Sequence, residues 1–230
     1  MARAVVIPDD APGRAAAIDV LRAGGIVALP TDTVYGIACD LAAPGGVERL
    51  FAVKSRPADR AIMLLLADRG QAPSLGLIGP AAQHLAEVFW PGALTLVVPR
   101  RADVRLPAAL TGGEPTIGLR VPDHPSPRAL ATAVGPLPTT SANRSGRPPA
   151  TDAQAIADEL GDGLDLVLDG GPTAGGPAAG GPASTVVDCT GEVTRLIRAG
   201  AIDPALLAAV LDAAGLPHGL GGSGSGDVGR

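Results

Sequence analysis

Short apolar runs alternate irregularly with amphipathic segments along the chain, and this alternation constrains the fold more than any other feature. The strand-like runs, each followed closely by proline or aspartate, cover residues 5–7, 26–29, 62–66, 94–98, 116–121 and 164–168. The helical patterns cover residues 12–23, 44–54, 80–90, 127–134, 152–160 and 204–214. Because strands and helices mix without a strict βαβ period, the sequence predicts an α/β fold with a twisted, mostly open mixed sheet flanked by helices.

The second half of the chain is richer in turn residues. Residues 138–149 are predicted to form a polar, turn-rich segment, and residues 170–182 a loop of glycine, proline and alanine. Residues 185–189 and 193–198 predict a closing β-hairpin with a Thr-Gly turn. We expect one folded domain over residues 1–202, a C-terminal helix over residues 203–214 and a disordered Gly/Ser-rich tail over residues 215–230.

Composition narrows the class of protein. Hydrophobic residues make up 46% of the chain and aromatic residues only 2%, which argues against a base-stacking platform for single-stranded nucleic acid. The net charge of −5 means that any RNA contact has to come from a local arginine patch. Cys39 and Cys189 lack metal-ligand spacing and are expected to be buried thiols. Without a signal-peptide pattern or a long apolar stretch, a cytoplasmic protein that does not contact the membrane is expected.

Several common catalytic patterns are missing from the sequence. It contains no P-loop, no Rossmann fingerprint and no G-x-S-x-G nucleophile elbow. His84, His124 and His218 are scattered without a second ligand at zinc spacing, so no metal site is expected.

Lys54 is the only lysine in the chain, and it stands two residues before Arg56. A compact ammonium beside a planar guanidinium suits a clamp on phosphate groups. A solvated lysine at the C-terminal end of a helix is equally ordinary. Position alone leaves both interpretations open.

Polar residues gather where the predicted strands begin or end. The clusters are Pro30-Thr31-Asp32-Thr33-Val34-Tyr35-Gly36, Lys54-x-Arg56-Pro57-x-x-Arg60, Thr116-x-Gly118-x-Arg120-Val121-Pro122, Thr139-Thr140-Ser141-Ala142-Asn143-x-Ser145-Gly146-x-Pro148 and Ser184-Thr185-Val186-Val187-Asp188. Each alone is compatible with an ordinary turn or strand end. Arg120 is harder to explain in that way, because a charge inside an apolar strand needs a partner or an anionic ligand.

Taken in order, these clusters and Phe89-Trp90-Pro91-Gly92-x-Leu94-Thr95 resemble the motifs of the YrdC family, the threonylcarbamoyl-AMP synthases. The resemblance covers roughly residues 14–202 and implies a YrdC-like catalytic domain with a concave, basic face. It also implies the reaction. Bicarbonate or CO2 and L-threonine give N-carboxy-threonine, which attacks the α-phosphate of ATP to give threonylcarbamoyl-AMP and pyrophosphate. A partner transferase complex then modifies the tRNA adenosine beside the anticodon.

The same resemblance implies roles for individual residues. The catalytic cluster on ATP and its phosphates would be Lys54, Arg56, Ser141 and Asn143. Further ATP contacts would come from Arg60, Thr116, Pro149 and Arg198. L-threonine would be held by Thr33, Arg120, Thr139 and Ser184. Mg²⁺ would accompany ATP, held mostly by phosphate oxygens and water because the motifs offer no carboxylate ligand.

The chain departs from the family pattern at two places. Many members continue Arg-Pro-x-x-x-Pro-Leu, whereas this chain has Arg60, Ala61 and Ile62 at the end of that run. Some members have histidine where Leu65 stands, which weakens any expectation of a threonine contact there. The longer members also carry a further C-terminal domain, so the chain looks like the short form, and the loop over residues 170–182 is a candidate to close the site.

Two other functions remain alternatives at this point. YrdC-like domains of hydrogenase maturation proteins make a carbamoyl-adenylate, but those proteins also carry acylphosphatase and zinc-finger parts. A non-catalytic RNA-binding module would use the basic face, although the acidic net charge and scarce aromatics argue against more than weak tRNA contact. Pyrophosphate release that depends on threonine would separate the synthase from both.

Overall fold

The computed structural model describes residues 4–54, 61–146, 150, 152–172 and 183–220. Its strands are β1 (Val5–Pro8), β2 (Val27–Leu29), β3 (Gly36–Ala38), β4 (Met63–Leu65), β5 (Leu94–Pro99), β6 (Thr116–Arg120), β7 (Leu137–Ser141), β8 (Leu166–Asp169), β9 (Thr185–Asp188) and β10 (Arg195–Arg198). Its α-helices are α1 (Ala11–Arg22), α2 (Gly46–Lys54), α3 (Pro80–Phe89), α4 (Ala108–Thr111), α5 (Pro125–Val134), α6 (Ala153–Leu160) and α7 (Pro204–Ala213). Two 3-10 segments complete the elements, η1 (Arg69–Ser74) and η2 (Gly161–Gly163).

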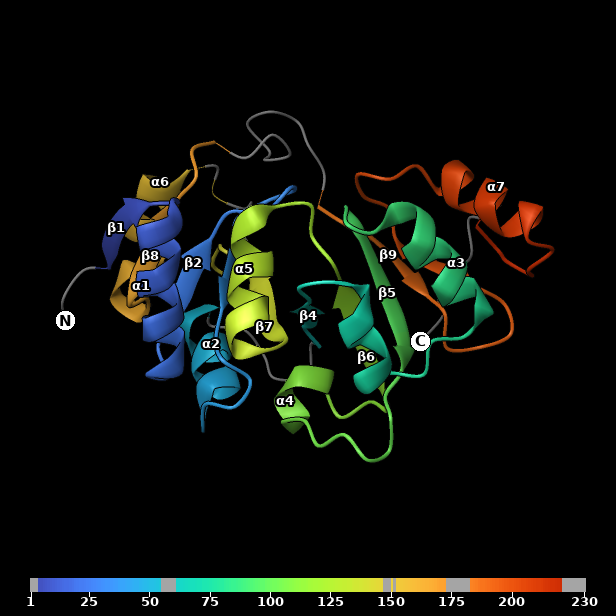
Figure 1. The fold of residues 1–230 in the computed structure, drawn as a ribbon, viewed down its shortest axis with the longest axis horizontal. Helices are drawn as coiled ribbons and strands as arrows, with labels where there is room; N and C mark the ends of the chain where they lie inside the picture. The colour runs from blue at the N-terminus through green and yellow to red at the C-terminus, as the bar shows by residue number, and fades with distance from the viewer. Residues whose placement is uncertain (1–3, 55–60, 147–149, 151, 173–182, 221–230) are drawn as a thin grey trace.

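The described strands form one mixed sheet, as the sequence predicts. Their order is β1-β8-β2-β3-β7-β4-β6-β5-β9-β10. Strands β1–β8, β2–β8, β4–β6 and β5–β9 pair in parallel, and β2–β3, β3–β7, β4–β7, β5–β6 and β9–β10 pair antiparallel. Neighbouring strands in the middle of the sheet are far apart in the sequence, so side chains from distant motifs come to lie next to one another (Figure 1).

Helices cover both faces of the sheet. Helices α1 and α5 lie side by side on one face, where they pack against Val27 and Leu29 of β2 and Leu137 of β7 (Figure 1). The alternate residue, Ala28, points to the opposite face and joins a second core with α2, α3, α6 and α7. This alternation is the period of two that a pleated strand imposes on its side chains. None of the described helices is long and apolar enough to cross a membrane.

Aspartate side chains begin several of the helices. Asp10 accepts a hydrogen bond from Gly13 N at 2.8 Å at the start of α1, and Asp152 accepts one from Ala155 N at 2.8 Å at the start of α6. Each satisfies a backbone donor that the first turn leaves without a helical partner. The helices that the sequence predicts over residues 12–23 and 152–160 are therefore confirmed, to within one residue at each end.

Two strands in the middle of the sheet were not predicted. The turn-rich assignment of residues 138–149 is wrong for its first part, because β7 pairs with β3 on one side and β4 on the other. The short strand β3 was missed as well. Thr139 and Thr140 are nearly buried, so their polar character reflects a cavity beside the strand rather than exposure in a turn.

The C-terminal helix is joined to the rest of the fold. Leu207 and Leu211 of α7 are fully buried and belong to the same core as the side chains of α3 and β5, and α7 lies beside α3 (Figure 1). The disordered tail predicted over residues 215–230 begins too early. His218 forms a β-bridge with Thr194, and Leu220 is buried. Residues 215–220 include apolar side chains, which explains why this segment packs against the fold. Residues 221–230 lie outside the described residues.

Replacing Leu211 with alanine is expected to lower the free energy of unfolding by about 2–4 kcal/mol, because its side chain is fully buried. Leu206 on the same helix is 58% exposed, so Leu206→Ala should change that free energy by less than about 0.5 kcal/mol. Urea unfolding followed by circular dichroism measures both variants. Equally small losses would contradict the placement of α7 in the core.

Candidate active site

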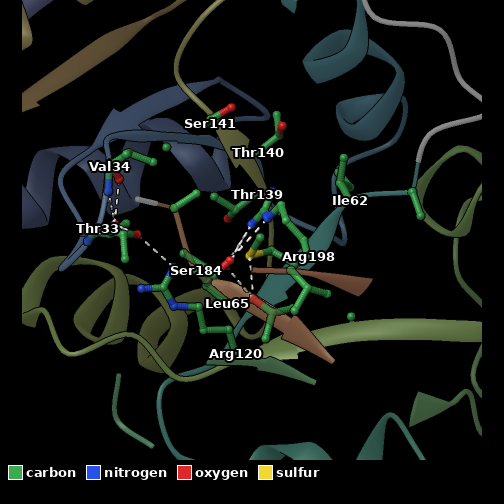
Figure 2. A pocket seen from close by; sticks show the side chains of 18 of the residues that line it. Thr33, Val34, Ile62, Leu65, Arg120, Thr139, Thr140, Ser141, Ser184 and Arg198 are labelled. Carbon is green, nitrogen blue, oxygen red and sulfur yellow. Dashed lines mark hydrogen bonds between the residues drawn. The ribbon is translucent and has the colours of Figure 1, made fainter. Parts of the chain in front are cut away.

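A cavity of about 450 Å³ opens on the face of the sheet that α1 and α5 partly cover (Figure 2). Leu65 of β4 lies at the boundary between the core and the cavity, because it packs in the core under α5 and also lines the cavity. All four residues predicted to hold L-threonine line this cavity, namely Thr33, Arg120, Thr139 and Ser184. Four of the residues predicted to contact ATP line it too, namely Thr116, Ser141, Asn143 and Arg198. Two arginines, Arg120 and Arg198, are also in its lining.

Strand register explains why these residues meet. Met63 of β4 lies opposite both Thr139 of β7 and Gly118 of β6, and Gly118 lies opposite Val97 of β5. All four residues line one face of the sheet. A Cβ atom on Gly118 would lie 3.6 Å from Met63 Cβ and 3.6 Å from Thr95 Cγ2. The absence of a side chain at Gly118 therefore keeps the cavity floor open.

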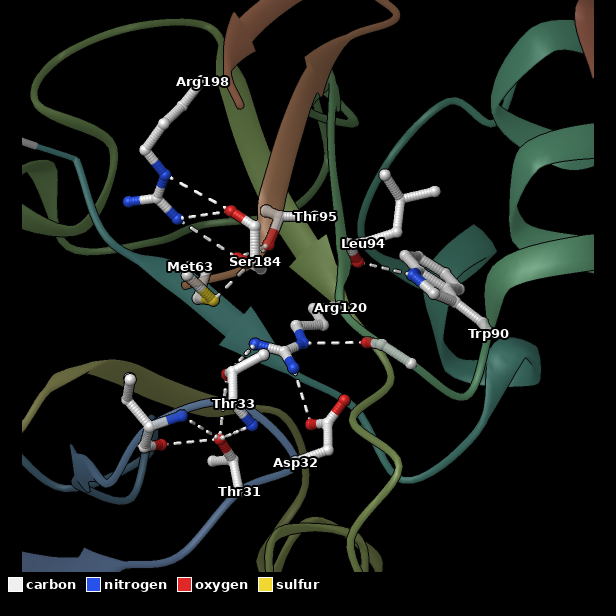
Figure 3. Close-up of polar contacts among 12 residues, drawn as sticks. Thr31, Asp32, Thr33, Met63, Trp90, Leu94, Thr95, Arg120, Ser184 and Arg198 are labelled. Atoms are coloured by element: carbon white, nitrogen blue, oxygen red, sulfur yellow. Dashed lines mark hydrogen bonds and ion pairs between the residues drawn. The ribbon is translucent and has the colours of Figure 1, made fainter. Parts of the chain in front are cut away.

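Arg120 is 3% exposed, and its guanidinium is held by three separate contacts (Figure 3). Nη2 donates to Asp32 Oδ1 at 2.6 Å, Nη1 donates to Thr33 Oγ1 at 3.0 Å, and Nε donates to Gly92 O at 2.9 Å. Burial lowers the pKa of Arg120 from its usual value, and the Asp32 carboxylate opposes that shift. A guanidinium carries five N–H donors, so the three contacts leave capacity for a carboxylate ligand.

The Phe-Trp-Pro-Gly motif supplies the backbone acceptor for Arg120. Trp90 Nε1 donates to Leu94 O at 2.7 Å and Gly92 N donates to Val121 O at 2.8 Å. These bonds fix the turn before β5, so that Gly92 O faces Arg120 Nε. The motif that the sequence left without a role is therefore part of the support of the buried arginine.

The threonines after β2 form a tight polar turn. Thr31 Oγ1 accepts from Thr33 N at 3.1 Å and from Val34 N at 3.2 Å, and it lies 3.1 Å from Thr33 Oγ1. Such bonds between a threonine hydroxyl and nearby backbone N–H groups stabilise a turn. Thr33 is thereby presented to Arg120 in a fixed orientation.

Lys54 ends α2 and is 2% exposed, so it is not a solvated helix-end lysine. Its Nζ donates to Ser141 O at 2.5 Å, to Ser141 Oγ at 3.1 Å and to Asn143 Oδ1 at 3.1 Å. Ser141 Oγ also donates to Asn143 Oδ1 at 2.6 Å. Ser141 and Asn143 line the cavity, so the ammonium lies one side chain behind its wall.

Ser184 and Arg198 form another polar group in the cavity wall. Arg198 Nη2 donates to Ser184 O at 2.8 Å and to Ser184 Oγ at 3.2 Å. Burial lowers the pKa of Arg198 from its usual value. Ser184 Oγ also lies 2.9 Å from Thr95 Oγ1. Ser184, directly before β9, and Arg198, at the end of β10, therefore lie at the same side of the cavity.

Tyr35 connects the cavity to the end of β8. Its hydroxyl donates to Gly171 O at 2.8 Å and accepts from Gly170 N at 3.1 Å. Burial raises the pKa of Tyr35 to about 12, so the phenol stays protonated and keeps both bonds. Cys39 and Cys189 are free and buried, as the sequence predicts, and burial raises the pKa of each thiol to about 12.

Three predicted ATP residues, Arg56, Arg60 and Pro149, lie outside the described residues. The sequence interpretation missed Asp32 and Thr95, although both lie inside motifs that it quoted. A buried arginine needs a carboxylate partner, and this rule points to Asp32 inside the Pro-Thr-Asp-Thr run. Among the described residues, no group of three His, Cys, Asp or Glu side chains is placed to hold a metal ion.

Comparison with known proteins assigns the fold and its motifs to one family. The Sua5/YciO/YrdC family profile, described as telomere recombination, matches residues 19–200. The chain is 37% identical to the threonylcarbamoyl-AMP synthase of Bacillus subtilis over 213 residues, which are 91% of the chain and 59% of that protein. It is 38% identical to the threonylcarbamoyl-AMP synthase of Vibrio vulnificus over 157 residues, which are 66% of the chain and 83% of that protein.

A solved structure agrees with these relatives. The crystal structure of Pyrococcus abyssi Sua5 complexed with L-threonine superposes with a TM-score of 0.82 at 31% identity. The match covers 97% of this chain and 64% of that one, so the chain spans about three fifths of the length of two of these relatives. The chain belongs to the Sua5/YciO/YrdC family.

Proposed function

We propose that the chain is an L-threonylcarbamoyladenylate synthase, a nucleotidyltransferase that uses L-threonine, bicarbonate or CO2, and MgATP. The observation that carries this proposal is that two different anion-recognition groups share one cavity. The buried fork of Arg120 stands at one part of its lining and Ser141 at another (Figure 2). Asn143 also lines the cavity, and Lys54 donates hydrogen bonds to both Ser141 and Asn143. The names of the relatives in Bacillus and Vibrio support the same activity.

The first half of the proposed reaction builds a carbamate. The amino nitrogen of L-threonine forms a bond to the carbon of CO2 and releases a proton, which gives N-carboxy-threonine. Arg120 would hold the threonine carboxylate, because a planar fork matches the two oxygens of a carboxylate. The P. abyssi Sua5 structure complexed with L-threonine supports an amino-acid ligand for a protein of this fold.

The second half transfers the adenylyl group. A carbamate oxygen attacks the α-phosphorus of ATP, and the bond to pyrophosphate breaks. Lys54, Ser141 and Asn143 would stabilise the charge that develops on the phosphate oxygens. Holding two weak reactants together in one cavity would supply much of the remaining rate. Mg²⁺ would enter with the triphosphate of ATP.

The proposed product would be the substrate of a second enzyme. Threonylcarbamoyl-AMP is a mixed anhydride that a partner transferase complex would consume to modify the tRNA adenosine beside the anticodon. Contact with tRNA itself would be weak, because the chain has a net charge of −5. These steps would take place in the cytoplasm.

Pyrophosphate release with MgATP and bicarbonate is expected to require L-threonine and to fall about 100-fold or more in Lys54→Ala, the loss expected when a charged group that stabilises a transition state is removed. The matched control is Arg22→Ala, which removes one positive charge from the exposed end of α1. An enzyme-coupled pyrophosphate assay measures all three proteins. Release without threonine would contradict the synthase proposal, and full activity in Lys54→Ala would contradict the role of the lysine.

Replacing Arg120 with lysine keeps the charge but removes the fork. We expect the KM for L-threonine to rise about 10- to 100-fold, because hydrogen bonds to charged groups contribute about 1.5–3 kcal/mol, while the KM for ATP changes little. Arg128→Lys, on α5 and bonded to Ala67 O, serves as the matched control. An unchanged KM for L-threonine in a folded Arg120→Lys protein would rule out this residue as the carboxylate contact.

A further inference from the structure

Thr95 is the last residue of the Phe-Trp-Pro-Gly-x-Leu-Thr motif, and the proposed reaction leaves it without a role. It lies on β5 between β6 and β9, is 2% exposed and lines the cavity. Its methyl group faces Gly118 of β6. Its hydroxyl faces Ser184, with the two oxygens 2.9 Å apart (Figure 3). Thr95 is therefore oriented by its neighbours so that its polar atom meets a residue of the cavity wall.

The hydrogen atoms in this group can be assigned by counting donors. Arginine only donates, so Ser184 Oγ accepts from Arg198 Nη2. The hydroxyls of Thr95 and Ser184 bring two further hydrogens, and one of them lies between the two oxygens. The other hydrogen is either donated by Thr95 to Met63 Sδ at 3.8 Å or pointed by Ser184 into the cavity.

A bound anion would select between these two arrangements. A thioether sulfur is a weak acceptor, so little is lost when Thr95 turns its hydrogen from Met63 to Ser184. A negatively charged oxygen is a strong acceptor, and a hydroxyl that already accepts two hydrogen bonds donates more strongly. Arg120 and Arg198 line the same cavity, which favours an anionic ligand beside Ser184.

We propose that Thr95 is a positioning residue for the amino-acid substrate. It donates to Ser184, so that Ser184 directs its own hydrogen to a carboxylate-type oxygen of the ligand. This oxygen belongs either to the carboxylate of L-threonine or to the carbamate formed on its nitrogen. The inference rests on the proposed function, which supplies this substrate.

The first test removes the hydroxyl and keeps the shape. Thr95→Val is expected to raise the KM for L-threonine about fivefold, the usual size of one net hydrogen bond, with kcat and the KM for ATP within about twofold of wild type. Thr95→Ser retains the hydroxyl and should restore the KM. Thr132→Val, on the exposed side of α5, is the matched control, and thermal unfolding shows whether each variant is folded. Equal KM values in Thr95→Val and wild type would overturn the proposal.

A double-mutant cycle tests whether Thr95 acts through Ser184. In Ser184→Ala, the further change Thr95→Val should have no added effect on the KM for L-threonine, because the hydroxyl that it orients is already gone. A merely structural role of Thr95 would instead give effects that multiply in the double variant. Multiplying effects would therefore overturn the proposal.

Two arms of the experiment identify the ligand oxygen and separate the proposal from the proposed function. Calorimetry with L-threonine alone, without ATP or bicarbonate, reports the carboxylate, and a weaker Kd in Thr95→Val assigns Ser184 to it. An unchanged Kd with a raised KM for bicarbonate assigns Ser184 to the carbamate. If neither constant changes while the wild type binds L-threonine, the role of Thr95 is wrong and the proposed function stands. A wild-type protein that binds no L-threonine and releases no pyrophosphate overturns both.

Discussion

The buried guanidinium of Arg120 is the constraint on which the cavity depends. An uncompensated charge in a protein interior costs several kcal/mol, so the fold has to bring partners to it. The partners come from two segments far apart in the sequence, Asp32 and Thr33 after β2 and Gly92 before β5. Strand β6 carries the charge, and hydrogen bonds join it to the turn after β2 and to the turn before β5 (Figure 3). One side chain thereby fixes the relative positions of three parts of the site.

The cavity exists because the sheet has small polar residues where a helix could otherwise pack. On the face that α1 and α5 cover, Leu65 and Leu137 are apolar and belong to the core. Farther along the same face the side chains become short, as at Gly118, Thr95 and Ser184. Backbone hydrogen bonding continues unchanged across this change. The sheet is thus both the support of the core and the floor of the candidate site.

Long periodic segments were predictable, and short central strands were not. Helices such as α3 and α6 have a clear apolar stripe with proline or aspartate at the start, so local sequence determines their type. Strand β7 contains Pro138, which disfavours a central strand, and its pairing with β3 and β4 overrides that tendency. Strand β3 has only three residues, too few for a pattern of alternation.

The sequence predicted part of the candidate site, namely residues that lie within recognisable motifs. Motif resemblance pointed to eight residues that line the cavity. It missed Asp32 and Thr95, which act on Arg120 and Ser184. Their importance follows from hydrogen bonds between residues that are 88 and 89 positions apart in the sequence. The spacing of residues within one motif does not predict such contacts.

The use of lysine at position 54 and arginine at position 120 follows from the shapes of their surroundings. Around Lys54 Nζ, three acceptors come from Ser141 and Asn143, which are only two residues apart, and a compact ammonium with three donors matches such a narrow group. Around Arg120 the acceptors come from separate segments and lie along the edges of a planar group. A planar guanidinium matches that narrow group less well than an ammonium does, and an ammonium at position 120 would not match three acceptors spread along the edges of a plane. The single lysine in a chain with 17 arginines therefore marks a site where the fold requires a small cation.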